Sequence, residues 1–198
     1  MRLSLSEIVS LAHGAVRAEE SEGYLRLCRF TAEQEAYYAR TSPRFHLRSL
    51  GSSGISLRFR TNSPTLRLAG RVTPGSSRTY YAIDVLANGA PVGVLRNFNP
   101  SEMIGNFTKE AFPLGDFSGE WALGEGEKTV EIVLPFSVCA EISELSLADG
   151  AHLSPVPPGA LHLAYGDSIT QGYDVLSPQN GYVARLLRAS RAPSGWKL

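Results

Sequence analysis

The chain has 198 residues, 43% of them hydrophobic, and its 19 basic and 19 acidic side chains cancel to a formal net charge of zero. This length suffices for one large domain or two small ones, each able to bury a core. The balanced charge argues against a nucleic acid or a membrane surface held by bulk electrostatics. Arg2 is a weak basic region and Glu7 interrupts the following apolar stretch, so we expect a cytoplasmic protein without a signal peptide.

The two cysteines, Cys28 and Cys139, lie in separate apolar stretches. Their number and spacing give neither a disulfide framework nor a C-x-x-C metal motif. We therefore predict two buried free thiols, and we expect no metal and no other cofactor.

The first predicted element is a short helix. Residues 4–7 (Ser-Leu-Ser-Glu) form a capping box. The spacing predicts a helix over Leu5–His13 that ends at Gly14. Its predicted buried residues are Leu5, Ile8, Val9 and Ala12. His13 then lies in the last turn, where the partial negative charge of the helix end suits it, and we expect no catalytic role for it.

A strand and a second helix come next. Tyr24 to Phe30 alternates between apolar and polar residues and predicts a strand. Residues 31–34 (Thr-Ala-Glu-Gln) form a second capping box, which opens a short helix. That helix should end near Arg40, ahead of Ser42-Pro43.

From Gly54 onward the sequence has a period of two, which is typical of half-buried strands. The alternating runs are 55–60, 66–72, 81–85, 92–95, 128–134 and 141–147. Asn88-Gly89 lies between two of them and predicts a tight hairpin. About seven to nine short strands joined by polar turns predict an antiparallel β-sandwich, jelly-roll-like, over about residues 15–150. Together with the first helix, this sandwich forms a predicted unit of residues 1–153.

Two sets of side chains in this region allow two interpretations. Four arginines alternate with the apolar face and either line a surface for an anionic sugar or acyl group or form a solvated sheet face, which we favour. They are Arg58, Arg60, Arg67 and Arg71. Six aromatic residues either stack against a sugar or pack in the core and loops, which we favour. They are Tyr80, Tyr81, Phe98, Phe107, Phe112 and Trp121.

Residues 154–160 contain three prolines and predict an extended, semi-rigid connector. A second unit, residues 161–198, begins with the apolar run Leu161–Tyr165, which predicts a buried parallel strand. A Gly-Asp-Ser turn ends this run, and a helical pattern follows through Tyr182 to Leu187. A serine between a strand and a helix is placed for nucleophilic attack, because backbone N–H groups of the next turn point at the same spot.

The serine turn has a seven-residue sequence. It reads Gly166, Asp167, Ser168, Ile169, Thr170, Gln171 and Gly172. Thr170 excludes the G-x-S-x-G nucleophile elbow, and the missing lysine after Gly172 excludes the phosphate loop. The turn resembles the first sequence block of the SGNH, or GDSL, hydrolase family. The alternative is an ordinary strand-to-helix turn with a capping serine.

This resemblance implies an α/β/α domain with a central parallel sheet that acts on esters. It implies that Ser168 is the nucleophile, that its N–H belongs to the oxyanion hole, and that four neighbours support the turn. These neighbours are Gly166, Asp167, Thr170 and Gly172. Several members of the family carry an N-terminal β-sandwich ahead of the hydrolase domain, and the whole chain looks like that arrangement.

The resemblance ends at the serine turn. The family's G-x-N-D and D-x-x-H blocks are absent, and no histidine follows Ser168. His162 precedes it by six residues in the expected strand, roughly 20 Å away at about 3.3 Å per residue, and His46 and His152 belong to the sandwich or its edge. The residues after Ala160 are fewer than the complete domain needs, which is on the order of 150 to 200.

We therefore expect the first part of an SGNH esterase or acyltransferase, catalytically incomplete in this chain, that acts on an acylated small molecule or carbohydrate. The alternative is a non-catalytic sandwich with a vestigial tail that binds a carbohydrate or a protein partner. An unused serine turn has no reason to keep all seven residues, which favours the enzyme. The predicted tail lacks paired strand edges, so it should pack on the sandwich, pair with a second copy as a homo-oligomer, or stay poorly ordered.

Overall fold

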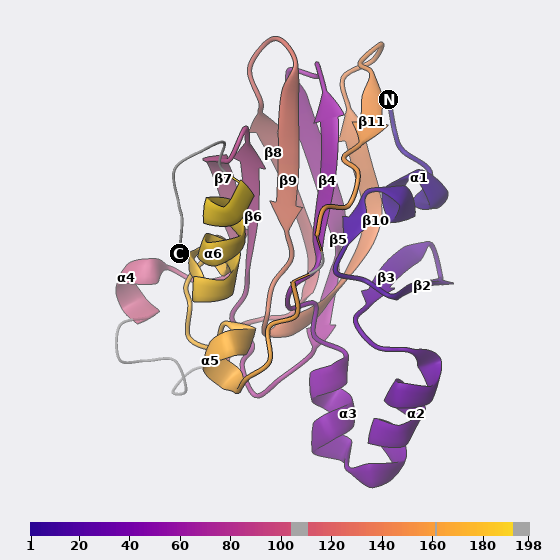
Figure 1. The fold of residues 1–198 in the computed structure, drawn as a ribbon, viewed down its shortest axis with the longest axis vertical. Coiled ribbons are helices and arrows are strands. Elements are labelled where there is room, and N and C mark those ends of the chain that lie inside the picture. Colours follow the sequence, from indigo (N-terminus) through magenta and orange to yellow (C-terminus); the bar gives the residue numbers. More distant parts are fainter. Residues whose placement is uncertain (104–110, 161, 192–198) are drawn as a thin grey trace.

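The structure is a computed structural model that describes residues 1–103, 111–160 and 162–191. Two β-sheets pack face to face, and helices lie at one end and on one outer face (Figure 1). Every strand pair among the described residues is antiparallel, which confirms the predicted sandwich.

The first sheet has six strands, five of them in the order β1-β4-β9-β6-β7. The sixth, β11, pairs with the same edge of β4 as β1 does, but further along that strand. These are β1 (Ala12–His13), β4 (Ser56–Thr61), β6 (Ala82–Ala87), β7 (Ala90–Arg96), β9 (Lys128–Val133) and β11 (Leu153–Pro155). The β6–β7 hairpin turns at Asn88 and Gly89, whose φ angles are 51° and 80°. Positive φ at both positions is the geometry of a two-residue hairpin turn, so that prediction is confirmed.

The second sheet has five strands in the order β2-β3-β10-β5-β8. These are β2 (Arg17–Ser21), β3 (Tyr24–Cys28), β5 (Thr65–Pro74), β8 (Gly115–Ala122) and β10 (Val138–Leu147). We did not predict β2 or β8, because neither presents a run of alternating apolar residues. Both are edge strands, where pairing on one side alone places little demand on the sequence.

The main core fills the space between the sheets. Leu57 and Phe59 of β4 point into it and are fully buried, whereas Ser56 and Arg58 face outward. The predicted buried thiols are confirmed, since Cys28 and Cys139 are free and buried. Burial raises the pKa of each thiol to about 11.

Three of the four sheet arginines form ion pairs on outer faces: Arg58 with Glu131, Arg67 with Glu144, and Arg71 with Glu141. This arrangement fits the solvated sheet face that we favoured. The aromatic residues pack as expected: Tyr80, Tyr81 and Phe98 are buried, and Phe112 and Trp121 pack against the two cores. Phe107 lies outside the described residues.

The first helix, α1 (Leu5–Ser10), begins with the predicted capping box but is shorter than predicted. Ala12 and His13 pair with β4 instead of extending it, because a sheet ladder satisfies their backbone groups as well as a helix does. Consequently Val9 is exposed, and Leu11 is buried in its place.

Two further helices project from the end of the sandwich. The second capping box opens α2 (Ala32–Thr41) as predicted, and α3 (Pro43–Ser49) follows without having been predicted. The chain leaves β3 at Cys28, two residues before Phe30. The buried carboxylate of Glu35 accepts a hydrogen bond from Arg26 at 2.9 Å, which ties α2 to β3.

The tail after the sandwich departs most from the prediction. Ser154 and Pro155 lie in β11 rather than in the connector. Residues 162–166 form no strand, and Leu163 and Tyr165 are 89% and 98% exposed. The expected buried strand is therefore wrong for these residues, because none of the described strands pairs with them. Leu161, where we expected that strand to begin, lies outside the described residues.

Three short elements complete the tail: α5 (Ser168–Gln171), the 3-10 helix η1 (Pro178–Asn180) and α6 (Tyr182–Arg191). The predicted helix through Leu187 is thus confirmed as α6. It lies over the outer face of the six-stranded sheet, in front of β6 (Figure 1), and the preceding η1 is hydrogen-bonded to that strand. A further one-turn helix, α4 (Pro100–Met103), precedes the region outside the described residues. No helix among the described residues has the length and apolar character needed to cross a membrane.

The position of the core predicts which substitutions lower the free energy of unfolding. Phe59→Ala should lower the free energy of unfolding by about 3–5 kcal/mol, because it removes a fully buried ring between the sheets. Phe45→Ala is the matched control, since the Phe45 ring of α3 is 51% exposed, and it should change the value by less than about 0.5 kcal/mol. Urea titrations followed by circular dichroism measure both, and equal losses would contradict the assigned core.

Candidate functional site

Ser168 is the first residue of α5, and Asp167 caps this short helix. The Asp167 carboxylate accepts a hydrogen bond from the Ile169 N–H at 3.0 Å, and its carbonyl accepts one from the Gln171 N–H at 3.1 Å. Both bonds fix the backbone on either side of Ser168. The serine hydroxyl is thereby held at the N-terminal end of the turn and is exposed to solvent.

The two glycines of the turn, Gly166 and Gly172, are needed for different physical reasons. A Cβ atom on Gly166 would lie 2.1 Å from Oγ1 of Thr170, so only glycine permits this close approach. Gly172 ends α5 with a φ of 102°, which favours glycine. The Thr170 hydroxyl lies 2.8 Å from the hydroxyl of Tyr182, which connects the turn to the start of α6.

Among the described residues, neither the hydroxyl nor the N–H of Ser168 has a hydrogen-bond partner. The N–H is thus available to an oxyanion, which the family resemblance requires of it. The hydroxyl lacks a proton acceptor, and a serine hydroxyl is a weak nucleophile at neutral pH without one. Within the described residues, the turn therefore presents an exposed serine hydroxyl without a general base beside it.

The histidines lie at other places in the fold. His46 is in α3, and His152 lies 3.3 Å from Glu127 at the edge of the sandwich. His13 contacts the carbonyl of Val156 at 3.2 Å. His162 is exposed in the stretch that forms no strand, so the separation from Ser168 that we based on a strand has no support here.

Two aspartates, which we call the anchors, hold the turn on the sandwich, and the first is Asp174. Asp174 accepts two hydrogen bonds from the Arg78 guanidinium, at 2.9 and 3.1 Å, and one from the Tyr80 hydroxyl at 2.8 Å. The Arg78 hydrogen bonds hold the pKa of Asp174 below its usual value. Asp174 has a φ of 61°, so it also supplies the left-handed residue that redirects the chain after α5.

In the second anchor the carboxylate belongs to the sandwich and the donors belong to the tail. Asp84 of β6 is completely buried beneath the tail. It accepts hydrogen bonds from the Ser177 hydroxyl at 2.6 Å and from the Gln179 N–H at 2.9 Å. Burial outweighs these bonds and raises the pKa of Asp84.

Apolar contacts reinforce both anchors. Tyr173 and Leu176 pack on a second core cluster, and the Tyr173 ring lies 5.4 Å from that of Phe136. The cluster comprises Tyr80, Ala82, Phe98, Met103 and Phe136. The Ser53 hydroxyl donates to the carbonyl of Gln171 at 2.7 Å. The tail therefore packs against the sandwich, the first of the three arrangements that we expected.

Sequence reasoning missed Asp84, Asp174 and Arg78 as determinants of the site. A signal for Asp84 was present, because it is the one charged residue of the otherwise apolar β6 sequence AIDVLA. A carboxylate in such a run is either solvated on one face or satisfied by a covering segment. Asp174 and Arg78 lie in polar loops and give no comparable signal.

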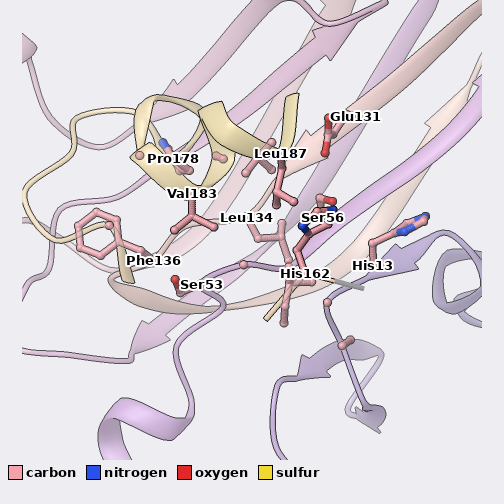
Figure 2. A pocket seen from close by; sticks show the side chains of 18 of the residues that line it. His13, Ser53, Ser56, Glu131, Leu134, Phe136, His162, Pro178, Val183 and Leu187 are labelled. Carbon is pink, nitrogen blue, oxygen red and sulfur yellow. The ribbon is translucent and has the colours of Figure 1, made fainter. Parts of the chain in front are cut away.

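A cavity of about 450 Å³ lies between the tail and the outer face of the six-stranded sheet. Figure 2 shows Ser56 and Glu131 on the sheet side, with Val183 and Leu187 reaching in from α6. Thr170, Gln171 and Gly172 line it, whereas Ser168 does not. Among the described residues, no group of three or more His, Cys, Asp or Glu side chains could hold a metal ion.

Comparison with known proteins places this geometry in context. No family model matches the sequence, and no curated protein matches it. A solved structure of a salicylyl-acyltransferase from a tetracycline biosynthetic pathway is 26% identical, covers 90% of this chain and aligns with a TM-score of 0.70. A protein from Bacteroides ovatus described as a GDSL-like lipase is 20% identical and covers 95%, with a TM-score of 0.61. These likenesses support the SGNH or GDSL resemblance.

This chain spans about half the length of both structures, 48% of the first and 53% of the second. A family 35 carbohydrate binding module from an environmental isolate, 16% identical, covers 54% of this chain and 75% of its own length. Its TM-score of 0.34 is too low to carry an argument about carbohydrate binding.

The two anchors should respond to pH in opposite directions. The pKa of Asp174 is lowered, so its contribution to stability is present above its ordinary value of 3.8 and is lost as pH falls through the folded-state pKa. The pKa of Asp84 is raised, so its contribution is complete below 3.8 and is lost as pH rises through the folded-state pKa. Urea titrations at several pH values separate the two.

Asp174→Asn should cost about 1 kcal/mol near pH 6, since solvent screens this partly exposed group, and should cost less at pH values below 3.8. Asn tolerates the positive φ, so the backbone is preserved. Asp84→Asn should show the reverse trend with pH. Asp116→Asn, on an exposed position of β8, is the control for the Asp-to-Asn change itself. A parallel pH dependence in both anchor variants would contradict the assignment.

Proposed function

We propose that this chain is the sandwich and nucleophile-bearing segment of a GDSL-type serine enzyme that acts on acyl esters. Ser168 attacks the ester carbonyl, and its own N–H helps to bind the oxyanion that forms. The substrate class is an acylated small molecule or carbohydrate. The observation that carries the proposal is the capped turn, in which an exposed Ser168 with an unoccupied N–H follows the Asp167 cap.

Two further observations support this proposal. The solved acyltransferase aligns with 90% of the chain, including its sandwich, at 26% identity. In addition, both glycines of the seven-residue turn are required by its geometry, which an arbitrary capping serine would not demand. The chain therefore retains the parts that give this turn its shape.

The chemistry needs a proton acceptor and a second oxyanion donor besides the groups present here. General-base assistance is worth about 10²- to 10⁴-fold in rate, and an oxyanion donor about 10²- to 10³-fold. The described residues place neither at the Ser168 hydroxyl. We therefore propose that the 198 residues alone hydrolyse esters no faster than a comparable unactivated serine.

Transfer to another hydroxyl, rather than to water, is the second candidate reaction. The likeness to a salicylyl-acyltransferase favours it. Both reactions share the acyl-enzyme at Ser168 and differ only in the acceptor that resolves it. The ratio of free acid to transferred ester formed in the presence of an alcohol distinguishes them.

A fluorophosphonate probe tests the nucleophile. We expect it to label the product of the complete gene at Ser168, and to label the 198-residue chain slowly or not at all. Ser168→Ala should abolish labelling and p-nitrophenyl acetate hydrolysis. Ser190→Ala, which changes an exposed serine near the end of α6, is the matched control and should retain both.

Two outcomes would overturn the proposal. Labelling of the complete gene product that persists in Ser168→Ala would place the nucleophile elsewhere. Absence of labelling and of acyl transfer in a folded complete product would favour a non-catalytic sandwich that binds a carbohydrate or a protein. Rapid hydrolysis by the 198-residue chain, lost in Ser168→Ala, would keep the nucleophile but show that a base within these residues reaches it.

A further inference from the structure

A pair of hydroxyl groups joins the serine turn to the last helix of the tail. Oγ1 of Thr170 lies 2.8 Å from the hydroxyl oxygen of Tyr182, and either group can donate the hydrogen bond. Thr170 belongs to α5, the short helix that begins with Ser168, and Tyr182 is the first residue of α6. The hydrogen bond therefore connects the helix that carries the serine to the helix that follows it in the tail.

The Thr170 side chain also contacts the chain on the other side of the serine. A Cβ atom on Gly166 would lie 2.1 Å from Oγ1 of Thr170 and 2.9 Å from its Cβ, so this side chain lies directly over the Gly166 backbone. The same oxygen makes this close contact and the hydrogen bond to Tyr182. Because threonine side chains occupy discrete rotamers, the Tyr182 hydroxyl favours the rotamer that keeps the two sides of the turn together.

This contact encloses the peptide group whose N–H the proposed reaction uses. The Ser168 N–H belongs to the planar peptide between Asp167 and Ser168, which lies between Gly166 and Thr170 in the chain. On the far side of the serine, its carbonyl accepts a hydrogen bond from the Tyr173 N–H at 2.9 Å. The contact of Thr170 with Gly166 therefore limits rotation of this peptide from its N-terminal side.

Tyr182 is presented by an element that the sandwich holds. The 3-10 helix η1 precedes it, and the Gln179 N–H of η1 donates to the Asp84 carboxylate at 2.9 Å. Gly181 is buried, and Val183 reaches from α6 toward the sheet (Figure 2). The Tyr182 side chain itself is 52% exposed, so it contributes little to the core. Its hydrogen bond to the serine turn is what distinguishes it from other exposed tyrosines.

We propose that Tyr182 is a positioning residue for Ser168. Its hydroxyl holds Thr170 over Gly166, and this contact orients the N–H and the side chain of Ser168 for attack on the ester. Tyr182 contacts neither the acyl group nor the oxyanion in this role. The inference rests on the proposed function, because it assigns Tyr182 to the same reaction at Ser168.

Tyr182→Phe tests this role, because it removes the hydroxyl and keeps the ring. In the complete gene product, the maximal rate of fluorophosphonate labelling at Ser168 should fall about three- to tenfold, which is the effect of one hydrogen bond. The probe concentration that gives half the maximal rate should stay the same, since Tyr182 does not contact the probe. Tyr37→Phe in α2 is the matched control, because Tyr37 is similarly exposed at 57%, and it should label as the unaltered product does.

A double-mutant cycle tests whether the effect passes through Thr170. Thr170→Val removes the hydroxyl with little change of shape and should slow labelling by a similar factor. Tyr182→Phe and Thr170→Val together should slow it no more than either change alone, because both remove the same hydrogen bond. Thr170→Ser keeps the hydroxyl and should lose less than Thr170→Val. Losses that multiply in the double variant would contradict the proposed path.

The 198-residue chain provides a readout that does not depend on reaction. In nuclear magnetic resonance relaxation measurements, the order parameter of the Ser168 amide should fall in Tyr182→Phe, because the peptide gains freedom to rotate. The midpoint of urea unfolding should stay that of the unaltered chain, since the hydrogen bond is exposed. A purely structural role would instead lower the unfolding midpoint and leave the Ser168 amide unchanged.

Three results would overturn the inference. An unchanged maximal labelling rate in folded Tyr182→Phe would overturn it and leave the proposed function intact. A lowered unfolding midpoint with an unchanged Ser168 amide would show that Tyr182 only stabilises the tail. No labelling of the unaltered complete gene product would overturn the proposed function and this inference with it.

Discussion

A carboxylate enclosed on the outer face of a sheet must be hydrogen-bonded, and Asp84 imposes this condition on the tail. β6 is buried on both faces, because the core lies on one side and the tail on the other. In the part of the chain that the structure describes, Ser177 and Gln179 donate hydrogen bonds to Asp84. The buried acid therefore constrains the path of the chain after the serine turn, together with Asp174 and the contacts of the tail with the aromatic cluster.

The serine turn is positioned through this attachment rather than through its own burial. Ser168 is exposed, while Tyr173 and Leu176 beyond it pack on the second core cluster. Asp174 adds a charged contact between these two apolar ones. This support would limit the motion of the Ser168 hydroxyl without enclosing it, which the proposed role as nucleophile requires.

The sequence patterns that are local in origin predicted the structure well. The capping boxes at residues 4–7 and 31–34, the Asn88-Gly89 hairpin and the alternating runs each depend on neighbours within a few residues. The failures required knowledge of distant partners. The length of α1 depends on β4, and the strand expected before Ser168 depends on a neighbouring strand that the described residues do not supply.

The candidate site was predictable in its chemistry but not in its support. The seven-residue turn indicated Ser168 and its cap directly. Asp84, Arg78 and the cavity at Gln171 arise from contacts between residues about ninety positions apart, which no local pattern encodes. An apolar run interrupted by one acid, as around Asp84, is the single sequence feature that pointed toward a covering segment.

The exposed stretch at residues 162–166 has a consequence for how the two parts of the chain hold together. The anchors that fix the turn all lie after it, from Gln171 to Gln179, and none lies within that stretch. Cleavage of the backbone there would leave the tail attached by these noncovalent contacts alone. We therefore expect the sandwich and the tail to behave as complementary fragments. Their association depends on the side-chain and backbone contacts between them rather than on the peptide bond that joins them.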